Sequence, residues 1–320
     1  MRTFVRILGF VGLALIAPSV SYAAEKADLR PKFKEGQTTY FRDATKITQS
    51  MAMGEQTMEV PMNIESGMRV KVVQVRPEGG ATVELTYLYV SFEGGPPQMP
   101  MSYDSRKKDA AANPMLSGLG GLVDKPITLT LSAGGKVEKV EGTERIKSSV
   151  AAGGPAAQIV ENMVSDDSLR KLRLYPSEGA PNPAEVGATW KEETETDMGG
   201  MATVVINANY TLKKIDSASN TAEIESSSTY KTKATEGAPS MVSIEDSKSQ
   251  GHTTADLKTG ELTRATEDTE MSMKFNAPGA PEGGTKMKQK IHSTVERVAL
   301  SDLNLPAEAP EKKPETPEKK

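Results

Sequence analysis

The stretch Val60–Phe92, VPMNIESGMRVKVVQVRPEGGATVELTYLYVSF, decides the fold. Its first arm alternates apolar and polar residues, the pattern of a β-strand with one buried face. Pro77-Glu78-Gly79-Gly80 then supplies turn residues. The second arm resumes the alternation with Val83, Leu85, Tyr87 and Tyr89 on one parity. The stretch therefore predicts a long antiparallel hairpin.

A weaker echo of this hairpin lies at residues 203–232. Gly36 and Gly187 each stand a few residues before an aromatic residue at the start of a strand pattern, and Gly135 and Gly260 each mark a later hairpin turn. The sequence therefore predicts a mainly β (α+β) fold. It consists of two similar long-stranded antiparallel β units, residues 24–142 and 184–306.

Between these units the apolar spacing changes to the helical period. Ile146 and Val150 are four residues apart, as are Ile159 and Met163. Pro155 suits a first helical position, and prolines follow from residue 176. Residues 143–183 are predicted to be a short helical connector that ends in a Pro-rich linker.

Both ends of the chain have their own composition. Arg2 and Arg6 precede an apolar run of about eleven residues, and Ser21-Tyr22-Ala23 fits a signal-peptidase site. Residues 1–23 are therefore predicted to be a signal peptide, with an uncleaved anchor as the alternative. Residues 307–320 are almost only Pro, Glu and Lys, so this tail is predicted to be disordered. The expected location is exported, periplasmic or extracellular.

Composition excludes several classes of function. The chain has no cysteine, so disulfides, thiol nucleophiles, thiolate metal sites and an N-terminal lipoprotein anchor are excluded. The net charge is −4, and about −6 without Arg2 and Arg6, whereas a nucleic-acid binder shows a basic excess. No segment after the signal peptide reaches the ~18 apolar residues of a membrane-spanning helix. We expect no nucleic acid, no stable membrane span and no cofactor.

Candidate catalytic residues are few. The two histidines, His252 and His292, lie 40 residues apart on different predicted strands, and neither adjoins a nucleophile-elbow pattern. The acidic run from Glu192 to Asp197 lacks the glycine and spacing of a calcium-binding hand. We predict that the protein is not an enzyme. A carboxylate-dependent hydrolase of extracellular polymers stays open, because paired carboxylates need neither His nor Cys.

Methionine is the unusual signal. Met-x-Met pairs occur three times, and such a pair in a strand places both thioethers on one face. Three readings are open: flexible core filler, a face that adapts to lipophilic or peptide ligands, and a Cu(I) site, because thioethers are soft ligands. The candidate metal ligands are Met51, Met53, Met271 and Met273. The candidate ligand-lining residues are Met62, Met68, Tyr87, Trp190 and Tyr210.

Several of these features together resemble a family of exported bacterial proteins of unknown function found in planctomycete-type bacteria. The features are the glycine-plus-aromatic strand openings, the helical middle, the Pro-rich linker before Gly187-Ala-Thr-Trp190, and the Asp256–Leu262 turn. The long amphipathic strands with a few helices are also loosely similar to the half-barrels of periplasmic lipoprotein carriers. The expected function is a non-enzymatic binding or scaffold protein of the cell envelope with a lipophilic or peptide ligand on a concave β face.

Overall fold

The computed structural model describes residues 25–53, 56–107, 115–150, 155–176, 179–197, 202–233, 241–276 and 284–306. The predicted signal peptide and the predicted disordered tail lie outside these residues and stay predictions.

The long strands come in two consecutive sets. The first set comprises β2 (Thr38–Met53), β3 (Gln56–Val75), β4 (Ala81–Gly94), β5 (Met101–Asp104), β6 (Pro126–Leu131) and β7 (Val137–Glu141). The second set comprises β9 (Thr189–Asp197), β10 (Thr203–Asp216), β11 (Thr221–Lys233), β12 (Val242–Asp256), β13 (Leu262–Phe275) and β14 (Thr285–Val298). The remaining elements are β1 (Lys26–Ala27), η2 (Ser117–Leu122), α1 (Thr143–Lys147), α2 (Pro155–Val164), α3 (Asp166–Arg170), β8 (Ala184–Glu185) and η3 (Leu300–Leu303). The mainly β fold with a helical connector is confirmed.

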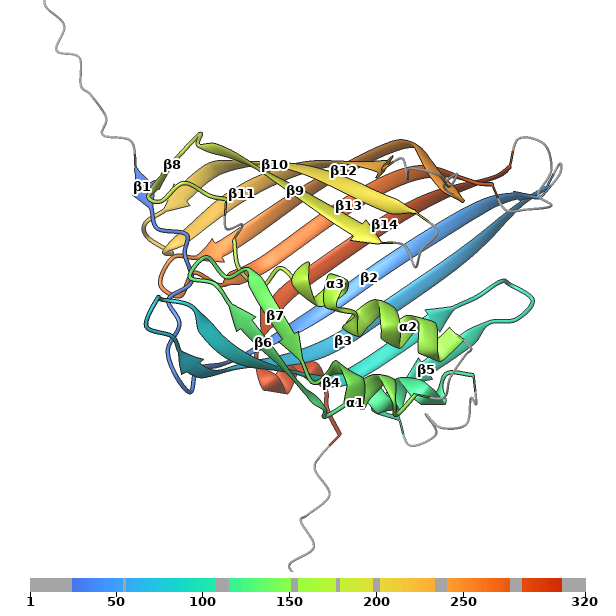
Figure 1. The fold of residues 1–320 in the computed structure, drawn as a ribbon, viewed down its shortest axis with the longest axis horizontal. Coiled ribbons are helices and arrows are strands. Elements are labelled where there is room, and N and C mark those ends of the chain that lie inside the picture. Colours follow the sequence, from blue (N-terminus) through green and yellow to red (C-terminus); the bar gives the residue numbers. More distant parts are fainter. Residues whose placement is uncertain are drawn as a thin grey trace, which may run out of the picture.

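All the long strands belong to one antiparallel sheet (Figure 1). Its order is β7-β6-β4-β3-β2-β14-β13-β12-β11-β10-β9, with β5 beside β4, while β1 and β8 form a separate pair. Each set is a meander, and the sets join where β14 pairs with β2. The sheet is therefore continuous across the two predicted units.

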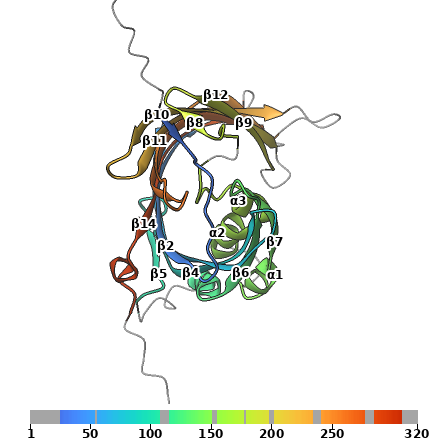
Figure 2. The same ribbon diagram turned by 90° about the vertical axis from the view of Figure 1, so that its left-hand side faces the viewer.

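The sheet is strongly curved, and α2 and α3 lie inside the curve against the first set of strands (Figure 2). The inner face of β3 and β4 packs with the helices into the main core, where Val70, Leu85, Leu129 and Ile146 are buried. At the other side, Trp190 and Tyr210 of β9 and β10 pack with Leu29 of the N-terminal segment, residues 25–37. The inner face is thus covered at both sides of the curve.

A β-bulge changes the expected alternation of β4. The register shifts between the pairs Gly67–Tyr89 and Met68–Tyr87, so Tyr87 faces inward and Tyr89 outward rather than both facing the same way. A Cβ on Gly67 would lie 2.3 Å from the Tyr89 ring. The Tyr89 hydroxyl donates to Glu65 at 2.5 Å. Glycine at position 67 therefore makes room for an aromatic ring on the outer face.

The two sets of strands open in the same way. Gly36 and Gly187 both have positive φ, 80° and 88°. Gly36 N donates to Val72 O, and Gly187 N donates to Leu212 O, each on the neighbouring strand. The predicted division into similar units stays a proposal, and this shared geometry supports it. Superposition of β2–β7 on β9–β14 tests it.

Candidate binding face

A strip of half-exposed side chains runs along the middle of the inner face. It comes from β2 and β14, which pair in register, so their inward side chains stand side by side. The open strip comprises Thr45, Ile47, Gln49, Gln289, Ile291 and Ser293, all half-exposed. Leu85 and Val83 face the same side of the sheet under the helices and are fully buried. The centre of the inner face is therefore accessible where its flanks are filled.

Solvent exposure alternates along β14, and this alternation distinguishes its inward-facing residues from its outward-facing ones. Its outward residues Lys288, Lys290 and His292 are exposed, whereas Gln289 and Ile291 are half-exposed. Met62 of β3 extends the strip, because Met62 pairs with Ile47, which pairs with Ile291. Three apolar side chains on adjacent strands thus form an apolar row across the strip.

Hydroxyl groups border the strip on β11–β13. Ser249 Oγ donates to Glu267 Oε1 at 2.6 Å, and Thr269 Oγ1 donates to Ser249 Oγ at 2.8 Å. Tyr230 Oη donates to the same Glu267 oxygen at 3.3 Å. Glu267 therefore sits in a polar network that is largely satisfied, beside the apolar row.

Asp43 is the exceptional charged group of this face. It shares the inward parity of Phe41 and pairs across the sheet with Ser66 and Val295. Among the described residues it has no hydrogen-bond or ion-pair partner. Burial raises the pKa of its carboxyl from 3.8 to about 6. Asp43 thus offers an unpaired carboxyl group to whatever occupies the inner face.

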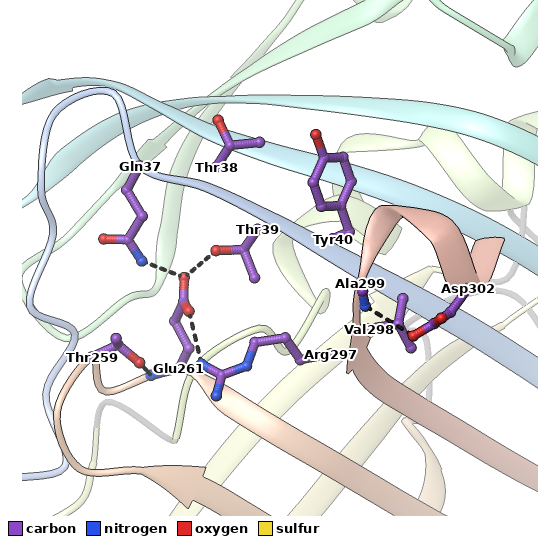
Figure 3. A pocket seen from close by; sticks show the side chains of 10 residues that line it. All are labelled: Gln37, Thr38, Thr39, Tyr40, Thr259, Glu261, Arg297, Val298, Ala299 and Asp302. Atoms are coloured by element: carbon purple, nitrogen blue, oxygen red, sulfur yellow. Dashed lines mark hydrogen bonds and ion pairs between the residues drawn. The ribbon is translucent and has the colours of Figure 1, made fainter. Parts of the chain in front are cut away.

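Apart from the open strip, a hollow of about 600 Å³ opens at the end of the sheet where β2 begins and β14 ends (Figure 3). We call it the end hollow. Its central group is Glu261, whose side chain is 6% exposed. Glu261 accepts from Gln37 Nε2 at 2.9 Å and Thr39 Oγ1 at 2.8 Å, and pairs with Arg297 at 3.3 Å. Arg297 also pairs with Asp256 at 2.9 Å.

These contacts give the end hollow a structural role. Through Glu261, in the β12–β13 turn, and Arg297 of β14, these contacts connect β2, β12 and β14 at the junction of the two sets. The N-terminal segment crosses the same end, where Lys32 N donates to Thr259 O at 2.8 Å and Phe33 packs edge-on against Tyr175 at 5.3 Å between ring centres. The polar groups of the hollow are thus used internally, and the open strip is the stronger candidate site.

The predicted ligand-lining residues lie in three places. Met62 lies beside the open strip. Met68 and Tyr87 are buried beneath α2, where Tyr87 Oη donates to Met163 O at 3.3 Å. Trp190 and Tyr210 are buried and stack at 5.5 Å. Four of the five thus pack in the protein core, and a ligand role for them stays a prediction.

The predicted metal ligands lie at the opposite end of the sheet from Glu261. Met51, Met271 and Met273 belong to one apolar cluster, and the side chain of Met53 lies outside the described residues. The cluster also contains Met287 of β14, which stands between β2 and β13. Sequence spacing did not single out Met287, because it forms no Met-x-Met pair.

The other candidates face solvent. His252 and His292 are exposed on the outer face, and His292 Nδ1 lies 2.7 Å from Asp268. In the acidic run, Glu195 pairs with Lys233 at 2.7 Å. Within the described ranges, no group of three or more His, Cys, Asp or Glu side chains could hold a metal ion. Within the same ranges, no helix has the length and apolarity to cross a bilayer.

Sequence reasoning missed Asp43 and Glu267. Both lie in strands at inward positions, where a polar residue between apolar ones is the available signal: Asp43 follows Phe41 and precedes Ile47 on the same parity. For β13 the inward parity is weakly apolar, with Ala265, Glu267, Thr269 and Met271, so alternation alone did not mark a face.

Comparison with solved structures gives weak likenesses. A lipovitellin structure, titled for lipid–protein interactions in lipovitellin, matches with a TM-score of 0.46 and 11% identity over 87% of this chain and 26% of that chain. A putative outer membrane lipoprotein-sorting protein domain from Vibrio parahaemolyticus has a TM-score of 0.16 and 9% identity over 82% and 89%. The chain spans about a quarter of the lipovitellin chain. Scores this low carry no functional argument.

No curated protein matches the chain. One family model matches residues 78–262, more than half of the chain, and its description is a family of unknown function, DUF6263. The matched region runs from the β3–β4 turn through the helical connector to the β12–β13 turn. The predicted membership in a family of unknown function is therefore confirmed: the chain belongs to the family DUF6263.

Proposed function

We propose that this protein is a non-enzymatic binding protein of the cell envelope that holds a lipophilic or peptide ligand on the open strip. The observation that carries the proposal is the half-exposure of Ile47 and Ile291 at the centre of an inner face whose flanks are buried. An apolar row bordered by hydroxyl groups suits a ligand with an apolar body and a polar part.

The carboxylates of the inner face favour binding over hydrolysis. Asp43 is on β2 and Glu267 is on β13, with β14 between them. Glu267 already accepts hydrogen bonds from Ser249 and Tyr230. The hydrolase alternative would need Asp43 as an acid and Glu267 as its partner, so it predicts polymer hydrolysis that an Asp43→Asn variant loses, whereas the binding function predicts no hydrolysis by either protein.

The test is a thermal-shift and fluorescence titration of the full exported chain with lysophosphatidylcholine as an amphiphilic probe. A ligand at 100 times its Kd stabilises the fold by about 2.7 kcal/mol, which raises the melting temperature measurably. Ile291→Glu places a charge in the apolar row and should weaken binding at least about tenfold, because each 1.4 kcal/mol is tenfold in Kd. His292→Glu places the same charge on the outer face and should leave binding unchanged.

Native mass spectrometry of protein purified without detergent gives an independent measurement. A co-purified mass that the Ile291→Glu variant loses supports the proposal. Ligand-free protein with no thermal shift from the amphiphile, from fatty acids or from apolar peptides contradicts it.

A further inference from the structure

Four methionines occupy successive register positions on four neighbouring strands. Met58 of β3 pairs with Met51 of β2, Met51 pairs with Met287 of β14, and Met287 pairs with Met273 of β13. Side chains at paired positions of an antiparallel sheet stand on the same face. These four residues form the methionine row, and their four thioethers lie side by side across the sheet.

The methionine row lies in apolar surroundings and is open at one side. Met273 and Met287 are 3% and 8% exposed, and they pack with Val242. Met51 and Met58 are half-exposed, so the row runs from a buried end to an accessible end. An ion can therefore reach the row from solvent and then be enclosed by apolar side chains.

We propose that the methionine row binds a soft monovalent metal ion, Cu(I), through the thioethers of Met51, Met287 and Met273, with Met58 at the access side. Thioethers are soft, neutral ligands that select Cu(I). Neighbouring strands are roughly 4.7–4.9 Å apart, and the three rotatable bonds of Met let adjacent sulfur atoms turn toward one ion. The chain has no cysteine, so thioethers are its only sulfur ligands.

The row revises the set expected from sequence. Met51 and Met273 remain, while Met271 stands two register pairs away, opposite Gln289. Met287 completes the contact, because β14 separates β2 from β13. The alternative is that the methionines only fill space against Val242 and Ile244. In that case replacement by leucine, which has a similar volume, should lower the free energy of unfolding only slightly and leave metal binding unchanged.

The experiment is an anaerobic Cu(I) titration of the full exported chain against a competing chelator, repeated with Ag(I) as a redox-inert probe. The test variant is Met287→Leu/Met273→Leu, and the matched control is Met62→Leu/Met68→Leu, two methionines of the same inner face outside the row. Removing a residue that only hydrogen-bonds to a metal ligand typically costs about 10–100-fold in metal affinity. Removal of two ligands should therefore weaken binding at least about 100-fold, and the control should bind as the wild type does.

Methyl NMR of methionine in the unmutated protein covers the case of a variant that does not fold. Ag(I) should shift the methyl signals of Met51, Met273 and Met287, and leave those of Met62 and Met68 in place. Equal affinity of test and control variants, or shifts spread over all methionines, would overturn the proposal. Neither outcome bears on the proposed binding of a lipophilic ligand, which is tested separately with lysophosphatidylcholine.

Discussion

Both sets of strands are antiparallel meanders, but the residues on their inner faces differ in burial and polarity. In the first set, Leu85 and Leu129 are buried under the helices. In the second set, the inward residues of β11 and β12 include Ser226, Ser228 and Ser247, which are half-exposed. Burial of a leucine side chain contributes about 1.5–3 kcal/mol, and a serine contributes no comparable apolar burial. The first set therefore contributes more apolar burial to stability, whereas the inner face at the junction with the second set stays accessible.

The largest expected effect is in the buried core of the first set. Leu85→Ala should lower the free energy of unfolding by roughly 2–5 kcal/mol, because it deletes buried methyl groups and leaves a cavity. Ile291→Ala, on the open strip, should cost less than about 1.5 kcal/mol, because part of its side chain already meets solvent. Urea unfolding of the full chain measures both. Equal losses would show that the open strip is packed as tightly as the core.

A smaller effect is expected at the junction of the two sets. Arg297→Gln leaves the buried Glu261 with a weaker partner and Asp256 without its ion pair, and should cost roughly 2–3 kcal/mol, less than a fully buried pair. Arg264→Gln is the control, since its partner is Glu296 at 3.5 Å and its side chain is 60% exposed. If the control loses as much stability, general charge rather than the junction explains the effect.

Asp43 should make stability depend on pH. Its carboxyl has a pKa of about 6 in the fold, above its value in the unfolded chain, so the folded state binds the proton more tightly. The folded state is then favoured below about pH 4 and loses that advantage as the pH rises to about 6. Asp43→Asn should therefore be more stable than the wild type above pH 6, by up to roughly 3 kcal/mol, and about equal to it at pH 4.

Chemical denaturation at pH 4, 5, 6 and 8 measures this difference. A difference that stays constant across this range would mean that water solvates the Asp43 carboxylate as fully as in the unfolded chain. That result would extend the open strip to Asp43, and so sharpen the contrast with the buried face of the first set.

The smallest effect is expected on the outer face. Lys290 pairs with Glu270 at 3.2 Å, and both side chains are mostly exposed. Lys290→Ala should change the free energy of unfolding by no more than about 0.5 kcal/mol, because exposed ion pairs are screened by solvent. A loss above about 1 kcal/mol in the same urea assay would show that ion pairs on the outer face also contribute to stability, and not only burial on the inner face.

The sequence predicted elements best where one face is strongly apolar. The hairpin of β3 and β4 has such a face, and the helical signal at Pro155 is confirmed, because Pro155 is the first residue of α2. The strand β12, VSIEDSKSQGHTTAD, has too few apolar residues for alternation to mark it. It is held by the strands on both sides, which a local pattern cannot show.

The sequence by itself determined the β class, the helical connector and the absence of thiol chemistry, because these depend on local periodicity and composition. Only the tertiary structure decided that β14 pairs with β2, since pairing between distant strands leaves no local trace. This one pairing brings Met51 beside Met287, Ile47 beside Ile291, and Thr39 and Arg297 to Glu261. The candidate sites depend on contacts across more than 200 residues of chain, so spacing along the sequence could name some of their members but could not assemble them.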